Sequence, residues 1–152
     1  THGDVVVRAG DLTGNGRLEI VLSPAEGSGR LSWFASSGEQ TPADPAGPDW
    51  VERVIDPELD HAHGLRLADM DGDGELDIVV AKMHQATAPQ EVAVYLNRGQ
   101  GSSWDKCVVA TTGSHNIALV DVGNTGRLDI YGANWNNRAS TGGAIELWLN
   151  QG

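Results

Sequence analysis

The chain has 152 residues, of which 21 are acidic and 10 are basic, and its formal net charge at pH 7 is -11. This length suits a single domain, and the acidic balance argues against nucleic acids and anionic membrane surfaces as partners. Cys107 is the only cysteine, which excludes a disulfide framework, and no segment approaches the roughly 18 consecutive apolar residues of a membrane span.

Short strands and tight turns are expected along the chain, because 20 glycines accompany 6 prolines and long helical periodicity is absent. The first apolar strand, DVVVRAG, leads into the acidic loop DLTGNGRLEI at 11–20, and the strands LSWFASSG and WVERVI follow. The same order recurs around DMDGDGELDI at 69–78 and DVGNTGRLDI at 121–130, so the loops are spaced 58 and 52 residues apart. Within the second repeat, Cys107 lies in the apolar run CVVA, where we expect a buried core thiol.

Each repeat is predicted to be a four-stranded antiparallel sheet, with the fourth strand missing from the third repeat. The repeats expected within a single domain at 1–152 are about 2–60, 61–112 and 113–152. A sheet of this size cannot bury both faces alone, so radial stacking predicts an all-β fold, a β-propeller with about two and three-quarter blades in this chain. We expect the aromatic residues at one shared position of the third strands to pack between blades; they are Phe34, Tyr95 and Trp148.

The loop DMDGDGELDI carries the most specific chemistry, because carboxylates stand at every second position with glycines between them. Such oxygens can converge on one hard cation, and calcium is the expected ion. The predicted ligands are Asp69, Asp71, Asp73, Asp77 and the backbone carbonyl of Glu75. A helix-loop-helix calcium hand is excluded, because Val80 stands where that motif needs a bidentate Glu. The apolar flanks indicate instead that the loop joins two strands.

The other two loops are weaker copies of this site. In the first, the predicted ligands are Asp11, Thr13, Asn15, the carbonyl of Arg17 and Glu19. In the third, where Gly123 supplies no side chain, they are Asp121, Thr125, the carbonyl of Arg127 and Asp129. We expect calcium to occupy the second loop most readily, then the first and then the third.

Both weaker loops carry an arginine at the seventh position. One hypothesis is that the guanidinium of Arg17 or Arg127 bridges the first and ninth carboxylates of its own loop and replaces the charge of an ion. The alternative is that this position contributes only its carbonyl and tolerates any side chain.

The three repeats resemble the FG-GAP, or VCBS, repeat family, which is known from integrin alpha-subunit propellers and many bacterial extracellular proteins. The resemblance covers nearly the whole chain and is most specific where DMDGDGELDI follows HGLRLA. It implies calcium in the loop between the first and second strands of a blade, and an extracellular, secreted or cell-surface location.

The connections at the other ends of the strands hold the candidate ligand contacts. His63 and His115 each stand six residues before a first loop aspartate, at equivalent positions where the innermost strands begin. They either contact a ligand or a transition metal in the central channel, or hydrogen-bond the turns between blades as structural residues. In the later segment NWNNR, Trp135, Asn136 and Arg138 combine an aromatic ring with polar donors, which suits a sugar ring, although a loop rich in Asn can also be just a loop.

The function predicted from these features is that of a non-catalytic extracellular calcium-binding module for adhesion, carbohydrate binding or protein binding. Because the third repeat lacks a strand, the chain is expected either to be part of a larger propeller or to self-associate as a filament or surface-layer subunit. A further alternative is part of a polysaccharide-degrading enzyme. It has little support, because the acidic clusters are explained as ion ligands and no nucleophile, base and orienting group occur together.

Overall fold

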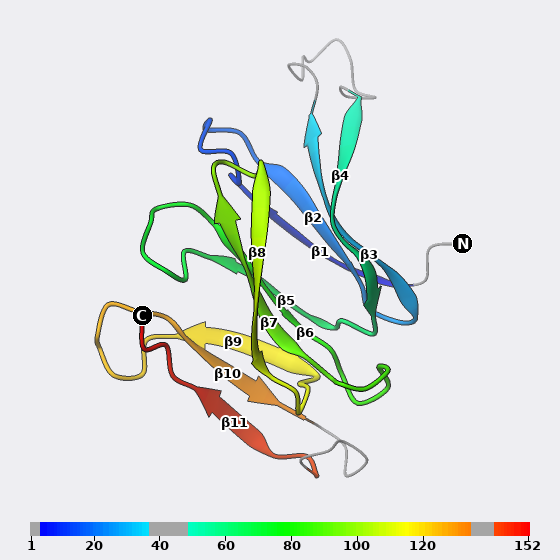
Figure 1. Ribbon diagram of the computed structural model, residues 1–152, viewed down its shortest axis with the longest axis vertical. Coiled ribbons are helices and arrows are strands. Elements are labelled where there is room, and N and C mark those ends of the chain that lie inside the picture. Colours follow the sequence, from blue (N-terminus) through cyan, green and yellow to red (C-terminus); the bar gives the residue numbers. More distant parts are fainter. Residues whose placement is uncertain (1–3, 37–48, 135–141) are drawn as a thin grey trace.

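The computed structural model describes residues 4–36, 49–134 and 142–152, which form three antiparallel sheets (Figure 1). The first sheet, in spatial order, contains β1 (Val5–Gly10), β2 (Glu19–Pro24), β3 (Ser28–Ser36) and β4 (Trp50–Asp60). The second contains β5 (Gly64–Ala68), β6 (Asp77–Ala81), β7 (Val92–Arg98) and β8 (Ser103–Ala110). The third contains β11 (Ile145–Trp148), β10 (Asp129–Ala133) and β9 (Asn116–Val120). The prediction of an all-β fold is confirmed, and no described segment is a helix with the length and apolar character of a membrane span.

The sheets follow one another with their first strands side by side. β5 contacts β1 of the preceding sheet and β9 of the following sheet, and the described sheets form an open fan and not a closed ring (Figure 1). The β1–β2, β5–β6 and β9–β10 loops all lie along one side of the fan, at the left in Figure 1. The β4–β5 and β8–β9 connections lie on the other side, so the acidic loops are separated from the segments that carry the histidines.

Apolar side chains fill the two spaces between neighbouring sheets. The first core joins Leu12, Val21, Leu31 and Trp33 to Leu65, Ile78, Val80, Ala93 and Tyr95. The second core joins Met70, Val79, Ala81, Val92 and Val94 to Ile117 and Ile130. Every residue of β6 is buried, because alternate side chains of this strand enter the two cores. The second sheet is therefore the centre of the fold.

The aromatic residues of the third strands behave differently in the three sheets. Tyr95 is buried in the first core and donates a 2.6 Å hydrogen bond from its hydroxyl to Asp56, and Trp148 packs against the second core. Phe34 is half-buried and lines a surface hollow with Val5 and Leu22. The prediction that these aromatic residues pack between neighbouring sheets is thus confirmed for Tyr95 and Trp148. It is wrong for Phe34, because no other described sheet covers its face of the first sheet.

Cys107 is exposed, so the prediction of a buried core thiol is wrong. The residue lies in β8, the last strand of the second sheet, and lines an apolar hollow with Val109 of the same strand and Trp148 of the third sheet. Among the described strands the third sheet ends at β11, so no strand lies over this part of β8. Val109 is 40% exposed for the same reason.

Candidate metal centre

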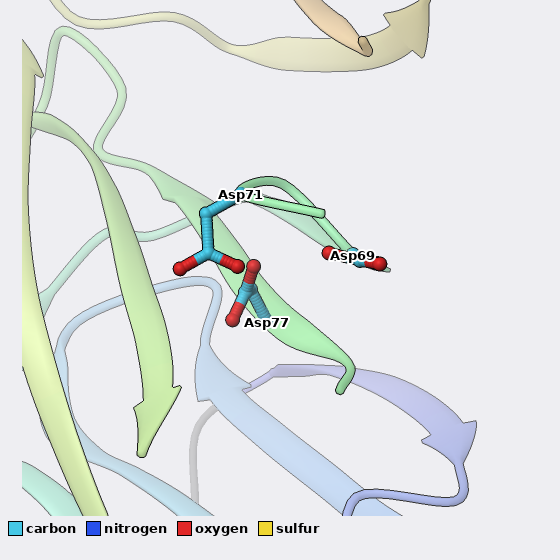
Figure 2. A group of neighbouring side chains, drawn as sticks. All are labelled: Asp69, Asp71 and Asp77. Atoms are coloured by element: carbon cyan, nitrogen blue, oxygen red, sulfur yellow. The ribbon is translucent and has the colours of Figure 1, made fainter. Parts of the chain in front are cut away.

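Three carboxylates converge in the loop between β5 and β6. Asp69, Asp71 and Asp77 each offer one oxygen, and these oxygens lie within 4.8 Å of one another. Figure 2 shows that Asp69 and Asp71 belong to the loop, whereas Asp77 is the first residue of β6. Ca²⁺ binds oxygen ligands at about 2.3–2.6 Å, so three oxygens at this spacing can contact one ion.

Backbone hydrogen bonds hold the loop in this shape. Asp69 accepts the N–H of Gly72 at 2.7 Å and the N–H of Gly74 at 2.9 Å, which folds the chain back over its first carboxylate. Gly72 and Gly74 have φ angles of 84° and 89°, a left-handed conformation that suits glycine. Asp71 and Asp73 each accept the N–H of the residue two positions further on. These side chains therefore fix the conformation of the loop in addition to carrying negative charge.

Asp77 is the buried member of the group, with an exposed fraction of 0%. Its two oxygens accept the N–H of Met70 at 2.7 Å and the N–H of Asn97 at 2.8 Å. Burial raises the pKa of Asp77, and the charges of Asp71 and Asp73 act in the same direction, although the two N–H groups oppose them. A bound cation would counteract these charges, because an ion favours the ionised carboxylate.

Arg98, at the end of β7, forms ion pairs with two carboxylates of this loop. Its guanidinium lies 2.7 Å from Asp71, 3.6 Å from Asp73 and 3.1 Å from Asp105. Hydrogen bonds to Asp71 and Asp105 raise the pKa of Arg98. The carboxylate of Glu75 also reaches the β7–β8 turn, where it accepts the N–H groups of Gly99 and Gln100. Sequence reasoning did not anticipate either contact, because both residues of each pair are far apart in the chain.

The first and third loops share this scaffold with fewer charges. Asp11 accepts the N–H of Asn15 and of Gly16, while Glu19 accepts the N–H of Leu12 at 2.8 Å and the hydroxyl of Thr13 at 3.3 Å. Asp121 accepts the N–H groups of Thr125 and Gly126, which lower its pKa, and Asp129 accepts that of Val122. Among the described residues, only the second loop brings three acidic, histidine or cysteine side chains close enough for one metal ion.

The two loop arginines do not bridge the carboxylates of their own loops. Arg17 places its guanidinium 3.5 Å from the hydroxyl of Ser36, in β3. The guanidinium of Arg127 lies beside Gly152, where a Cβ would be 3.1 Å from its Nη2. Within the described part of the chain, no ion pair joins either arginine to its first or ninth carboxylate. The bridging hypothesis is therefore wrong: the guanidinium of Arg17 lies toward β3 and that of Arg127 toward Gly152.

The comparison with protein families agrees with the repeats that the acidic loop sequences predicted. The model of the FG-GAP-like repeat matches residues 11–80 and 69–132, and each match begins at the first aspartate of an acidic loop. The chain belongs to the FG-GAP-like repeat family. FG-GAP repeats are typically non-catalytic modules, are typical of extracellular proteins and often bind calcium. No curated protein matches the chain significantly.

Two asparagines connect the acidic loops of successive FG-GAP repeats. Asn97 donates its backbone N–H to Asp77 and its side-chain amide, at 2.8 Å, to the carbonyl of Leu12 in the preceding loop. Asn150 repeats both contacts one sheet later, with Asp129 at 2.8 Å and the carbonyl of Met70 at 2.7 Å. Sequence reasoning missed them, although LNRG and LNQG recur at the ends of the third strands and would have pointed to them.

The opposite edge of the FG-GAP repeats brings together the two histidines named from the sequence. The rings of His63 and His115 stack with centroids 4.6 Å apart, and Nε2 of His63 lies 3.6 Å from the carboxylate of Glu26. Burial lowers the pKa of His115, with the nearby imidazoles of His63 and His84 acting in the same direction and Glu26 against them. The other predicted ligand contacts, Trp135, Asn136 and Arg138, lie outside the described residues.

Proposed function

We propose that this chain is a non-catalytic extracellular β-propeller module whose second acidic loop binds calcium as a structural brace. The observation that carries the proposal is the convergence of Asp69, Asp71 and Asp77 in a loop that Asn97 ties to the preceding one. The proposed ligands are the Asp69, Asp71, Asp73 and Asp77 carboxylates and the carbonyl of Glu75.

Bound calcium would lower the electrostatic repulsion among the carboxylates of the β5–β6 loop. The carboxylates of Asp69, Asp71 and Asp77 lie together, and that of Asp77 is buried. Arg98 contacts Asp71 and also Asp73, an exposed residue of the same β5–β6 loop. A divalent ion would reduce this repulsion and fix the loop against β6 and the neighbouring repeat. The dissociation constant expected for an extracellular site is about 0.1–1 mM, so about 5 mM calcium would stabilise the fold by about 1–2 kcal/mol.

The biological role proposed for the braced module is binding, through adhesion, carbohydrate recognition or protein recognition. The proposed calcium loops lie on one edge of the sheets, and the β4–β5 and β8–β9 connections lie on the opposite edge (Figure 1). This separation supports a structural role for the first edge and a ligand-binding role for the second. The first and third loops are proposed as weaker calcium sites, because they keep two acidic residues each, Asp11 with Glu19 and Asp121 with Asp129.

The experiment that tests the calcium site is isothermal titration of the protein with Ca²⁺ after treatment with a chelator. The variant Asp71→Asn should lose the tightest calcium binding, with an affinity reduced about tenfold or more. Glu58→Gln is the matched control, because it removes one exposed negative charge near the other ends of the strands and should leave binding unchanged. Equal affinity in the wild type and in Asp71→Asn would refute the proposed site.

A second candidate function, self-assembly by strand addition, is favoured by one surface feature. Among the strands that the structure describes, β11 pairs with β10 alone, and next to it lies the apolar hollow that contains Cys107, Val109 and Leu149. A strand from a neighbouring copy could pair with β11 and cover this hollow. Light scattering coupled to size-exclusion chromatography should then show a mass that rises with concentration, whereas a monomer at all concentrations would exclude this function.

A further inference from the structure

Neighbouring sheets of this chain contact each other through the same positions each time. The face that a sheet turns to the following sheet, its forward face, carries the second residue of the acidic loop and a directly paired couple from the second and third strands. These residues are Leu12, Val21 and Trp33 in the first sheet, and Met70, Val79 and Val94 in the second. All of them are buried, with exposed fractions of at most 7%.

The face that a sheet turns to the preceding sheet, its backward face, uses a different set of positions. These residues are Leu65, Ile78 and Tyr95 in the second sheet, and Ile117, Ile130 and Trp148 in the third. The eighth residue of the acidic loop, Leu76 or Leu128, packs against the same core. Each contact between two described sheets therefore joins one forward face to one backward face.

The third sheet has a forward face that no described sheet covers. Its equivalent residues are Val122, Tyr131 and Leu147, with exposed fractions of 55%, 40% and 40%. Tyr131 pairs directly with Leu147 and with Ala118, so these side chains share one face of the sheet. Neither this row nor the next one, Asn116, Ala133 and Ile145, contains a charged side chain, although the net charge of the chain is -11.

The first sheet has an uncovered backward face at the other end of the fan (Figure 1). Its equivalent residues are Val7, Leu18, Ile20 and Phe34. Val7 is 48% exposed and Leu18 is 65% exposed, whereas Ile20 and Phe34, which pair across β2 and β3, are half-buried. An antiparallel sheet with one face in water usually carries polar side chains on that face, and exposed apolar patches often mark interaction sites. Both outer faces are therefore suited to being covered.

We propose that the forward face of the third sheet binds the backward face of the first sheet in a second copy of this chain. Within the chain, a forward face is covered by a backward face at both contacts between sheets, and the uncovered face of each kind is present on the same molecule. The two surfaces differ, so the contact is head-to-tail, and repeating it gives either a closed ring or an open filament.

A ring of two copies is the expected product. Each copy supplies three described sheets, so two copies supply six, which lies within the roughly four to eight blades of closed propellers. This assembly does not depend on calcium in the acidic loops. It also differs from strand addition at β11, because it covers the faces of the outer sheets and leaves the edge of β11 unpaired.

The test is the mass of the protein in solution, measured by analytical ultracentrifugation over a range of concentrations. The wild type should reach the mass of two chains and no higher mass. Val7→Lys changes the backward face of the first sheet, and Leu147→Glu changes the forward face of the third. Each variant should raise the dissociation constant of the dimer at least about tenfold, because the contact would bury an unpaired charge. Both side chains are exposed in a single copy, so the variants should fold, which circular dichroism checks.

Mixing the two variants tests whether the contact is head-to-tail. An equimolar mixture of Val7→Lys and Leu147→Glu should recover a dimer, because one forward face and one backward face are unaltered and the two altered faces carry opposite charges. Val108→Lys is the matched control. Val108 is also 48% exposed but lies in β8 of the second sheet, outside both uncovered faces, so this variant should have the mass of the wild type.

Four outcomes would overturn the proposal. The wild type is a monomer at every concentration, or it forms masses above that of two chains, which indicate an open series of copies. Folded Val7→Lys and Leu147→Glu dimerise as the wild type does, or their mixture stays monomeric. If these two variants keep the dimer while Val109→Lys, in the hollow beside β11, loses it, the contact is strand addition at that edge instead.

Discussion

The backbone N–H of Asn97 donates a 2.8 Å hydrogen bond to the buried carboxylate of Asp77, at the point where β7 ends and β6 begins. The side chain of Asn97 also bonds the carbonyl of Leu12, whose own N–H is bonded to Glu19. The ninth carboxylates of the second and third loops, Asp77 and Asp129, are therefore each connected to the preceding loop through one asparagine. This relay explains how an ion bound in one loop can stabilise the contact between two sheets.

Replacement of Asn97 by Ala should destabilise the protein by about 2–3 kcal/mol, because Asn97 is 1% exposed and its loss leaves buried polar groups without partners. These groups include the carbonyl of Leu12 and the N–H of Gly101, which bonds the side-chain oxygen of Asn97 at 2.6 Å. Urea unfolding measures the change. Asn150→Ala is the matched variant in the next repeat and should cost less, about 1 kcal/mol, because Asn150 is only half-buried. Equal stability of Asn97→Ala and the wild type would contradict the role of the relay.

Replacement of Arg98 by Gln should strengthen calcium binding about two- to fivefold, the range expected for loss of one exposed competing charge. The guanidinium is 2.7 Å from Asp71, so it repels an ion that shares this carboxylate. Calorimetric titration gives the affinity. Arg30→Gln removes an equal charge near the other edge, where Arg30 pairs with Glu52, and should have no effect. Weaker calcium binding in Arg98→Gln would mean that this side chain supports the site.

Asp60 should make stability depend on pH below 4. Burial acts to raise its pKa, but the N–H of Thr87 at 2.6 Å and the ammonium of Lys82 at 2.9 Å outweigh it and lower the pKa to about 2. A lowered folded-state pKa stabilises the fold above the ordinary value of 3.8, and this stability is lost as the pH falls from about 4 to about 2. The contribution is about 2 kcal/mol.

The matching measurement compares urea unfolding of the wild type and Asp60→Asn at several pH values. The variant should be less stable by about 2 kcal/mol at pH 5, and the difference should shrink as the pH approaches 2. A difference that stays constant over this range would show that ionisation of Asp60 does not contribute.

Cys107 should react with a thiol reagent in the folded protein without denaturant, because its side chain is exposed beside Val109. Absorbance of the released chromophore follows the reaction. If copies assemble by strand addition at β11, the reaction should slow as the protein concentration rises, since the added strand would cover the thiol. A thiol that reacts only after unfolding would contradict the exposed position.

Local pattern was sufficient to predict much of this fold. Alternating carboxylates and glycines predicted the loop that brings Asp69, Asp71 and Asp77 together, and the repeated order of strands predicted the sheets. Period and spacing report on contacts within one repeat, and these are the features that the structure confirms.

Contacts between repeats were harder to predict from the sequence. Cys107 and Phe34 were wrongly predicted to be core residues, because an apolar run does not show whether a neighbouring strand or sheet covers it. Arg98 and Asn97 reach the acidic loops from strands 20 or more positions away, and no local pattern encodes such a distance. The stacking of His63 on His115 was foreseen only as an equivalence of position.

The most direct test of the calcium brace compares the melting temperature of the protein in 5 mM Ca²⁺ with that in excess chelator. This calcium concentration is about five times the upper end of the range of expected dissociation constants. We expect calcium to raise the melting temperature by about 2–4 °C for each kcal/mol of binding free energy. Asp71→Asn should lose most of this rise, and Glu58→Gln should retain it. Identical melting temperatures of the wild type in calcium and in chelator would contradict the account.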